Sequence, residues 1–120
     1  MASIRTKRAY ERPHEDDGVR ILVDRLWPRG VHKAAARFEY WAKAIAPSHE
    51  LRKWYGHDPA KWPEFKRRYY AELATKPDEL ATLMDYVAAG PVTFVYSSKE
   101  RELNNATALK EYVEAELGRT

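Results

Sequence analysis

Cysteine is absent from this chain of 120 residues. Its absence excludes disulfide bonds, a thiol nucleophile, iron–sulfur clusters and zinc sites built from cysteine. Long apolar runs are absent as well, and none approaches the ~20 residues that cross a bilayer. The first residues, MASIRTKRAYERP, lack the apolar stretch of a signal peptide. We therefore expect a cytoplasmic protein without a membrane span.

Several signatures of nucleotide, metal and acyl-transfer chemistry are also missing. Neither GxGxxG nor GxxxxGK[ST] occurs in the sequence. No serine is surrounded by the glycines of a nucleophile elbow. The histidines do not form a zinc spacing such as HExxH, so we expect no metal site; they are His14, His32, His49 and His57. These patterns indicate no particular cofactor.

The composition is that of an ordinary globular chain, with 44% hydrophobic and 32% charged residues. Its length fits a single domain, 1–120, that buries roughly 65% of the unfolded surface. The net charge of +3 is uneven, because residues 1–37 hold nine Lys and Arg against five Asp and Glu. This basic excess is either a solvated surface or a patch for phosphate, nucleotide or nucleic acid.

Hydrophobic patterns predict strands alternating with helices. Three strands are expected over residues 3–9, 19–24 and 92–96, the last (VTFVY) being the clearest. Apolar residues at helical spacing predict helices over 38–45, 48–56, 59–74 and 77–90, and a final helix carrying the apolar stripe from Leu103 to Leu117.

Local signals support several of these helix ends. Ser48 is expected to cap the second helix and Gly56 to stop it, while Asp58 is placed to cap the third with Pro59 at its first position. Gly90 is a typical C-terminal cap for the fourth.

The expected fold is α/β, a small layered domain with a mainly parallel three-to-four-stranded sheet flanked by helices. In such sheets ligands bind beyond the carboxyl ends of the strands. Two loops follow strands here, over residues 24–33 and 97–105. If the second and third predicted strands are parallel neighbours, these two loops face each other.

The first loop begins with the sequence DRLWPRG. Arg25 and Arg29 carry guanidinium forks that match carboxylate or phosphate, and Trp27 offers a flat face. Asp24 can orient an arginine, bind a metal ion or act as a base. The alternative is a structural corner, in which Asp24 pairs with an arginine and Trp27 is simply buried.

The second loop, SSKERELNNA, carries small polar side chains between a strand and a helix. Ser97, Ser98, Asn104 and Asn105 can donate to an anion at the helix N-terminus. Their alternative role is capping of the helix and shaping of the turn.

The segment WYGHDP carries His57, which could act as a general acid or base because histidine titrates near neutral pH. The alternative makes His57 an ordinary loop residue next to a capping aspartate. Trp41, Trp54 and Trp62 fall on or beside apolar helical stripes and are expected in the core, although residues 41–62 could also form an aromatic wall over a pocket.

Three stretches together resemble the YeaO-like branch of the domain-of-unknown-function 488 family. They are DGVRILVDRLWPRGVHK, WAKAIAPSHELRKWYGHDPAKWPEFKRRYYAEL and VTFVYSSKERELNNATALKEYV, and they cover nearly the whole chain in order. The resemblance implies a bacterial protein with a small α/β fold. It also implies a Cys/His/Arg-bearing segment after a later strand, where this chain has Asn104, Asn105 and Ala106. That departure removes a thiol and an imidazole but leaves anion binding intact.

The leading hypothesis is a pocket for an anionic or phosphorylated small molecule at the strand ends. Its predicted lining is Asp24, Arg25, Trp27, Arg29, Ser97, Ser98, Asn104 and Asn105, with His57 near. If a reaction follows, hydrolysis or transfer on a phosphate or nucleotide-like substrate is expected, with Asp24 or His57 as base. The rivals are a nucleic-acid binder that uses Arg5, Lys7, Arg8 and Lys33, and a non-catalytic interaction module.

Overall fold

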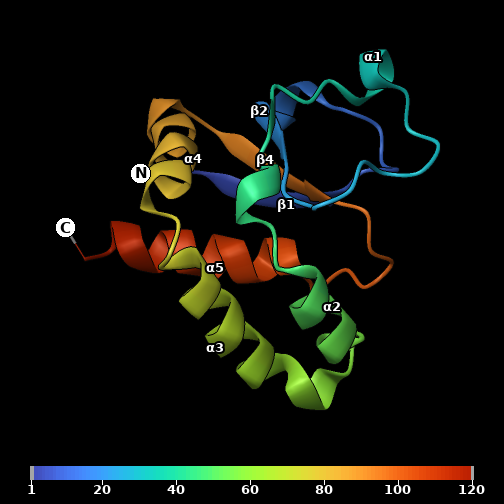
Figure 1. Cartoon of the computed structure of the whole chain (residues 1–120). Coiled ribbons are helices and arrows are strands. Elements are labelled where there is room, and N and C mark those ends of the chain that lie inside the picture. Colours follow the sequence, from blue (N-terminus) through green and yellow to red (C-terminus); the bar gives the residue numbers. More distant parts are fainter. Residues whose placement is uncertain (1, 120) are drawn as a thin grey trace.

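A parallel four-stranded sheet forms the centre of the structure, a computed structural model that describes residues 2–119. Its strands are β1 (Ile4–Arg8), β2 (Val19–Leu22), β3 (Tyr40–Trp41) and β4 (Val92–Tyr96), in the order β1-β4-β2-β3 (Figure 1). All three strand pairs are parallel. The α/β fold expected from the sequence is therefore confirmed.

The helices lie mostly where the sequence places them. They are α1 (Lys33–Ala36), α2 (His49–Tyr55), α3 (Trp62–Leu73), α4 (Pro77–Ala89) and α5 (Asn105–Leu117), with 3₁₀ turns over Glu15–Asp17, Lys43–Ile45 and Pro59–Lys61. The expected caps of the second helix are confirmed, because Ser48 Oγ accepts from Leu51 N and Gly56 follows α2 in the left-handed conformation. Asp58 accepts from Ala60 N, but it caps the 3₁₀ turn that leads into α3 and not α3 itself. Gly90 follows α4 as expected, in an extended conformation. No helix among residues 2–119 has the length and apolar character needed to cross a membrane.

The helix predicted over residues 38–45 is wrong. Tyr40 and Trp41 form β3, which pairs with Ile21 and Leu22 of β2, and only a 3₁₀ turn follows. Aromatic residues favour strands, and a partner strand some twenty residues away offers backbone hydrogen bonds that a local periodicity cannot reveal.

Helices α2 to α5 cover one face of the sheet. Alternate strand residues such as Ile21, Phe94 and Tyr96 join one core with side chains from these helices, among them Phe65 and Leu109. Figure 1 shows α3 and α5 on one side of the sheet and the segment carrying α1 on the other.

Loops rather than long helices cover the opposite face. Arg20 of β2 is buried there, where its Nε donates to Ala36 O and its Nη1 donates to Asp17 Oδ2 at 2.8 Å. Thr93 of β4 donates to Asp17 O. Gly18 lies between Asp17 and β2 at φ +64°. A Cβ at this position would lie 2.2 Å from Pro91 O, so a larger residue does not fit there. Hydrogen bonds of Asp17, Arg20 and Thr93 therefore hold the loops against this face of the sheet.

Strands β1, β2 and β4 all end at the same edge of the sheet. The parallel pairing of β2 with β4 places residue 24 and residue 97 next to each other, as Val23 N donates to Val95 O just before both loops begin. The predicted meeting of the two loops is thereby confirmed, and it fixes the place of the candidate site.

Candidate functional site

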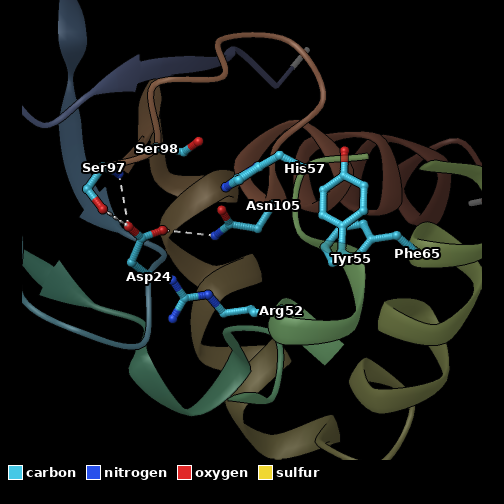
Figure 2. A pocket seen from close by; sticks show the side chains of 8 residues that line it. All are labelled: Asp24, Arg52, Tyr55, His57, Phe65, Ser97, Ser98 and Asn105. Atoms are coloured by element: carbon cyan, nitrogen blue, oxygen red, sulfur yellow. Dashed lines mark hydrogen bonds between the residues drawn. The ribbon is translucent and has the colours of Figure 1, made fainter. Parts of the chain in front are cut away.

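A cavity of about 130 Å³ opens where the loops after β2 and β4 meet α2 and α5. We call it the polar cavity; it is lined by Asp24, Arg52, Tyr55, His57, Phe65, Ser97, Ser98 and Asn105 (Figure 2). Two loops, three helices (α2, α3 and α5) and the turn after α2 thus contribute side chains to one space.

Asp24 holds this cavity together. Its Oδ2 accepts from Ser97 N at 2.9 Å and from Ser97 Oγ at 2.6 Å, and its Oδ1 accepts from Asn105 Nδ2 at 3.0 Å. Asn105 uses the same amide to donate to Val23 O. The carboxylate is 8% exposed, so these bonds lie away from bulk water. Asp24 therefore joins the ends of β2 and β4 to the first turn of α5.

The loop after β4 is fixed from its other side by β1. Arg8 Nε donates to Ser98 O at 2.8 Å, and its Nη2 donates to Ser97 O at 3.2 Å. Further along the loop, Arg101 forms an ion pair with Glu11 at 2.6 Å, and this hydrogen bond lowers the pKa of Glu11. The main chain around Ser97 and Ser98 is consequently held in place before any ligand arrives.

Two basic side chains point into the space that Asp24 borders. Figure 2 shows the guanidinium of Arg52, from α2, and the imidazole of His57 directed toward the carboxylate and Asn105. The Arg52 side chain has no hydrogen-bond or ion-pair partner among residues 2–119. His57 lies in the left-handed region at φ +57°, which is uncommon for a residue other than glycine.

Aromatic side chains close the inner wall. Tyr55 stacks on Phe65 with ring centroids 4.3 Å apart, and its hydroxyl donates to Leu103 O at 2.7 Å. Burial, together with the nearby charges of Glu100 and Asp58, raises the pKa of Tyr55 to about 12. The hydroxyl stays protonated at neutral pH and serves as a structural donor, not as a base.

A second depression adjoins the polar cavity. We call it the loop hollow; its volume is about 260 Å³, and it is lined by Tyr10, Asp24, Leu26, Trp27, Pro28, Arg29, Arg52 and Ser97. Asp24, Arg52 and Ser97 border both spaces, so the two form one continuous surface. Trp27 is fixed by donation from its Nε1 to Val31 O and by edge contacts with Phe38 and Trp41.

The structure brings together most of the residues that the sequence selected. Asp24, His57, Ser97, Ser98 and Asn105 line the polar cavity, and Trp27 and Arg29 line the loop hollow beside it.

Two of the selected residues lie elsewhere. Arg25 borders a different hollow with Lys43, Lys76 and Glu79. Asn104 is buried and caps α5, because its Oδ1 accepts from Thr107 N at 2.9 Å and its Nδ2 donates to Glu100 O.

Sequence reasoning did not select Arg52, Tyr55 or Phe65. Tyr55 belongs to the segment 41–62, whose aromatic residues predict a possible wall over a pocket. The sequence therefore indicates part of this wall. Arg52 lies next to Lys53 on the exposed side of α2, and nothing in the local sequence distinguishes these two basic residues.

The basic residues considered for nucleic-acid binding are partly occupied by contacts within the chain. Lys7 donates to both carboxylate oxygens of Asp17, and Arg8 is bound to the loop after β4. Arg5 and Lys33 remain exposed. No group of three or more His, Asp or Glu side chains between residues 2 and 119 is arranged to hold a metal ion.

The positive φ of His57 predicts backbone strain next to the polar cavity, which two substitutions can measure. We expect His57→Gly to be about 1 kcal/mol more stable than His57→Ala, because only glycine adopts φ +57° without steric cost. Both variants lack the imidazole, so urea unfolding of the pair isolates the backbone effect. Equal stability of the two variants would show that residue 57 is not strained.

The chain has relatives among known proteins. A family model described as "Inactive DUF488-N3 subclade" matches residues 3–120. Uncharacterized protein YeaO of Escherichia coli (strain K12) is 40% identical over 111 residues, which cover 92% of this chain and 96% of that protein. Uncharacterized protein Rv3073c of Mycobacterium tuberculosis (strain ATCC 25618 / H37Rv) is 41% identical over 106 residues, 88% of this chain and 89% of that protein. No solved structure gives a significant match. This chain therefore belongs to the DUF488-N3i family, and the resemblance read from its three motifs is confirmed.

Proposed function

We propose that this protein binds a small phosphorylated molecule at the carboxyl edge of its sheet and does not transform it. One observation carries the proposal: the guanidinium groups of Arg29 and Arg52 border a continuous hollow, and neither has a partner among residues 2–119. Guanidinium forks match phosphate oxygens, and unpaired ones beside a concave surface are ready to bind them.

The donors available to a ligand are fewer than the sequence suggested. Ser97 Oγ and both hydrogens of the Asn105 amide are used by Asp24 and Val23 O. Ser98 Oγ accepts from Glu100 N and keeps its own hydrogen, and His57 offers a ring N–H in either protonation state. We therefore assign Arg52, His57 and Ser98 to the phosphate group, and Asp24, Ser97 and Asn105 to the frame that holds them.

The volume of the polar cavity suits this assignment. Its volume of about 130 Å³ corresponds to roughly four waters at ~30 Å³ each, so the cavity has room for one phosphate group. The Asp24 carboxylate would repel an anion placed against it, so the phosphate belongs on the side of Arg52 and His57, where the local charge is favourable.

Binding without catalysis is supported by two points. The matching family is described as an inactive subclade. In addition, Asn104 and Asn105 stand where the wider family has residues suited to covalent and acid–base chemistry, and both are engaged in structural hydrogen bonds.

Calorimetric titration with inorganic phosphate tests the proposal. We expect Arg52→Ala to weaken phosphate binding at least tenfold, because a charge-assisted hydrogen bond contributes roughly 1.5–3 kcal/mol. Arg25→Ala is the matched control: it removes an exposed arginine from the same loop as Arg29, but at a different hollow, and should leave the affinity unchanged.

Two results would contradict the proposal. One is the absence of binding to the folded wild type at millimolar phosphate, which would favour the structural-corner interpretation of the loop after β2. The other is an equal loss of affinity in Arg25→Ala and Arg52→Ala, which would indicate unspecific attraction to a basic surface.

A further inference from the structure

The loop hollow is lined by apolar side chains that a phosphate group does not need. Among residues 2–119, the two large hydrophobic side chains that are exposed are Leu26, at 66%, and Tyr10, at 49%. Both border the loop hollow, together with Trp27 and Pro28. Single exposed apolar side chains are common on protein surfaces, but two that meet at one concavity beside a polar cavity are typical of a ligand site.

Two of these apolar side chains, Tyr10 and Trp27, are held in place by contacts within the chain. The Tyr10 hydroxyl donates to Arg29 O at 3.0 Å, and the Arg8 guanidinium lies over the Tyr10 ring at 5.0 Å. Trp27 is braced by Val31, Phe38 and Trp41. A wall fixed in this way loses little conformational entropy when a ring packs against it.

The chemistry of the surface changes along its length. At one end the polar cavity presents Arg52, His57 and Ser98. At the other end the loop hollow presents Tyr10, Leu26 and Trp27, with Arg29 at its border. Asp24, Arg52 and Ser97 lie between the two ends and belong to both. A molecule that fills the whole surface needs a small anionic head and a flat apolar body.

We infer that the ligand is a phosphate monoester that carries a planar apolar group, an aromatic ring or a heterocyclic base, with its phosphate in the polar cavity and its ring in the loop hollow. This inference rests on the phosphate-binding function proposed above and narrows its ligand class. The arginine at the border, Arg29, then contacts the ester oxygens or the ring face, since a guanidinium can do both.

Three probes with the same phosphate group distinguish phosphate binding as such from binding of an aromatic phosphate monoester. They are inorganic phosphate, methyl phosphate and phenyl phosphate. We expect phenyl phosphate to bind the wild type about tenfold more tightly than methyl phosphate, a difference of 1.4 kcal/mol that corresponds to roughly 55 Å² of apolar surface removed from water. The dissociation constants are measured by titration calorimetry of the full chain.

Leu26 supplies the variants for this test, because a side chain that is 66% exposed can be shortened without unfolding the protein. Leu26→Ala should reduce the preference for phenyl phosphate to below about threefold while the affinity for methyl phosphate stays unchanged. Leu26→Met keeps the apolar surface and should keep the preference.

The outcomes distinguish failure of this inference from failure of the proposed function. Equal affinities for methyl and phenyl phosphate, with clear binding of both, would overturn the aromatic ligand and leave phosphate binding standing. A preference for phenyl phosphate that Leu26→Ala does not reduce would also overturn the inference, because the ring would then bind elsewhere. If none of the three probes binds the folded wild type, both proposals fail.

Discussion

Replacing Asp24 with alanine is expected to lower the free energy of unfolding by roughly 3–5 kcal/mol. The carboxylate accepts three hydrogen bonds in a position that is 8% exposed. Its removal leaves the Ser97 amide and hydroxyl without their acceptor. It also removes one of the two hydrogen bonds by which Asn105, in the first turn of α5, is tied to the end of β2. Urea unfolding followed by tryptophan fluorescence measures the change.

Asp85→Ala is a suitable control, because Asp85 is exposed on α4 and its loss should change stability by less than about 0.5 kcal/mol. Asp24→Asn should also destabilise the protein, since an amide nitrogen would face one of the Ser97 or Asn105 donors. If the free energy of unfolding of Asp24→Ala lies within about 1 kcal/mol of the wild-type value, Asp24 does not hold the site together. Asp24 would then have to be interpreted as a residue that contacts the ligand directly.

Replacing Asp17 with alanine should have a comparable effect on the other face of the sheet, again about 3–5 kcal/mol. Asp17 accepts from Arg20 Nη1, from Lys7 Nζ and from His14 N. Arg20 is only 4% exposed, and its Nη2 already has no hydrogen-bond partner in the described structure. Without Asp17 a buried guanidinium would remain with a single acceptor, Ala36 O.

The neighbouring Asp16→Ala is the control for Asp17, because Asp16 is exposed. The double variant Asp17→Ala/Arg20→Met should recover part of the lost stability, since it removes the uncompensated charge along with its partner. A double variant no more stable than Asp17→Ala alone would show that the loss comes from the loop backbone and not from the buried charge.

Acid unfolding provides an independent check on Asp17. Burial opposes its ionisation, but hydrogen bonds from His14 N, Lys7 and Arg20 outweigh that effect and lower the pKa of Asp17 below its ordinary 3.8. A lowered pKa contributes stability that is fully present above the ordinary value and is lost as the pH falls through the value in the folded state. Below about pH 4, stability should therefore fall more steeply in the wild type than in Asp17→Ala.

The helix caps and the central strand show what sequence reasoning handles well. Ser48 and Asp58 cap backbone groups two or three residues away, so their role is written in the local sequence. The run VTFVY forms β4, buried on both faces, as a continuous β-branched and aromatic segment predicts. Residues 38–45 show the limit, because the same apolar spacing fits a helix and a short strand, and only pairing with β2 selects the strand.

For the site, the sequence by itself determined the chemistry of the two loops and their expected place at the carboxyl ends of neighbouring parallel strands. Those features follow from residue type and strand order. Only the tertiary structure decided which side chains line the polar cavity and the loop hollow. In the structure Arg25 lies at a different hollow, Asn104 caps α5, and Arg52 of α2 borders both spaces. The reason is physical, since the direction of a loop side chain depends on the backbone path that distant hydrogen bonds, such as those of Asp24 and Arg8, impose on it.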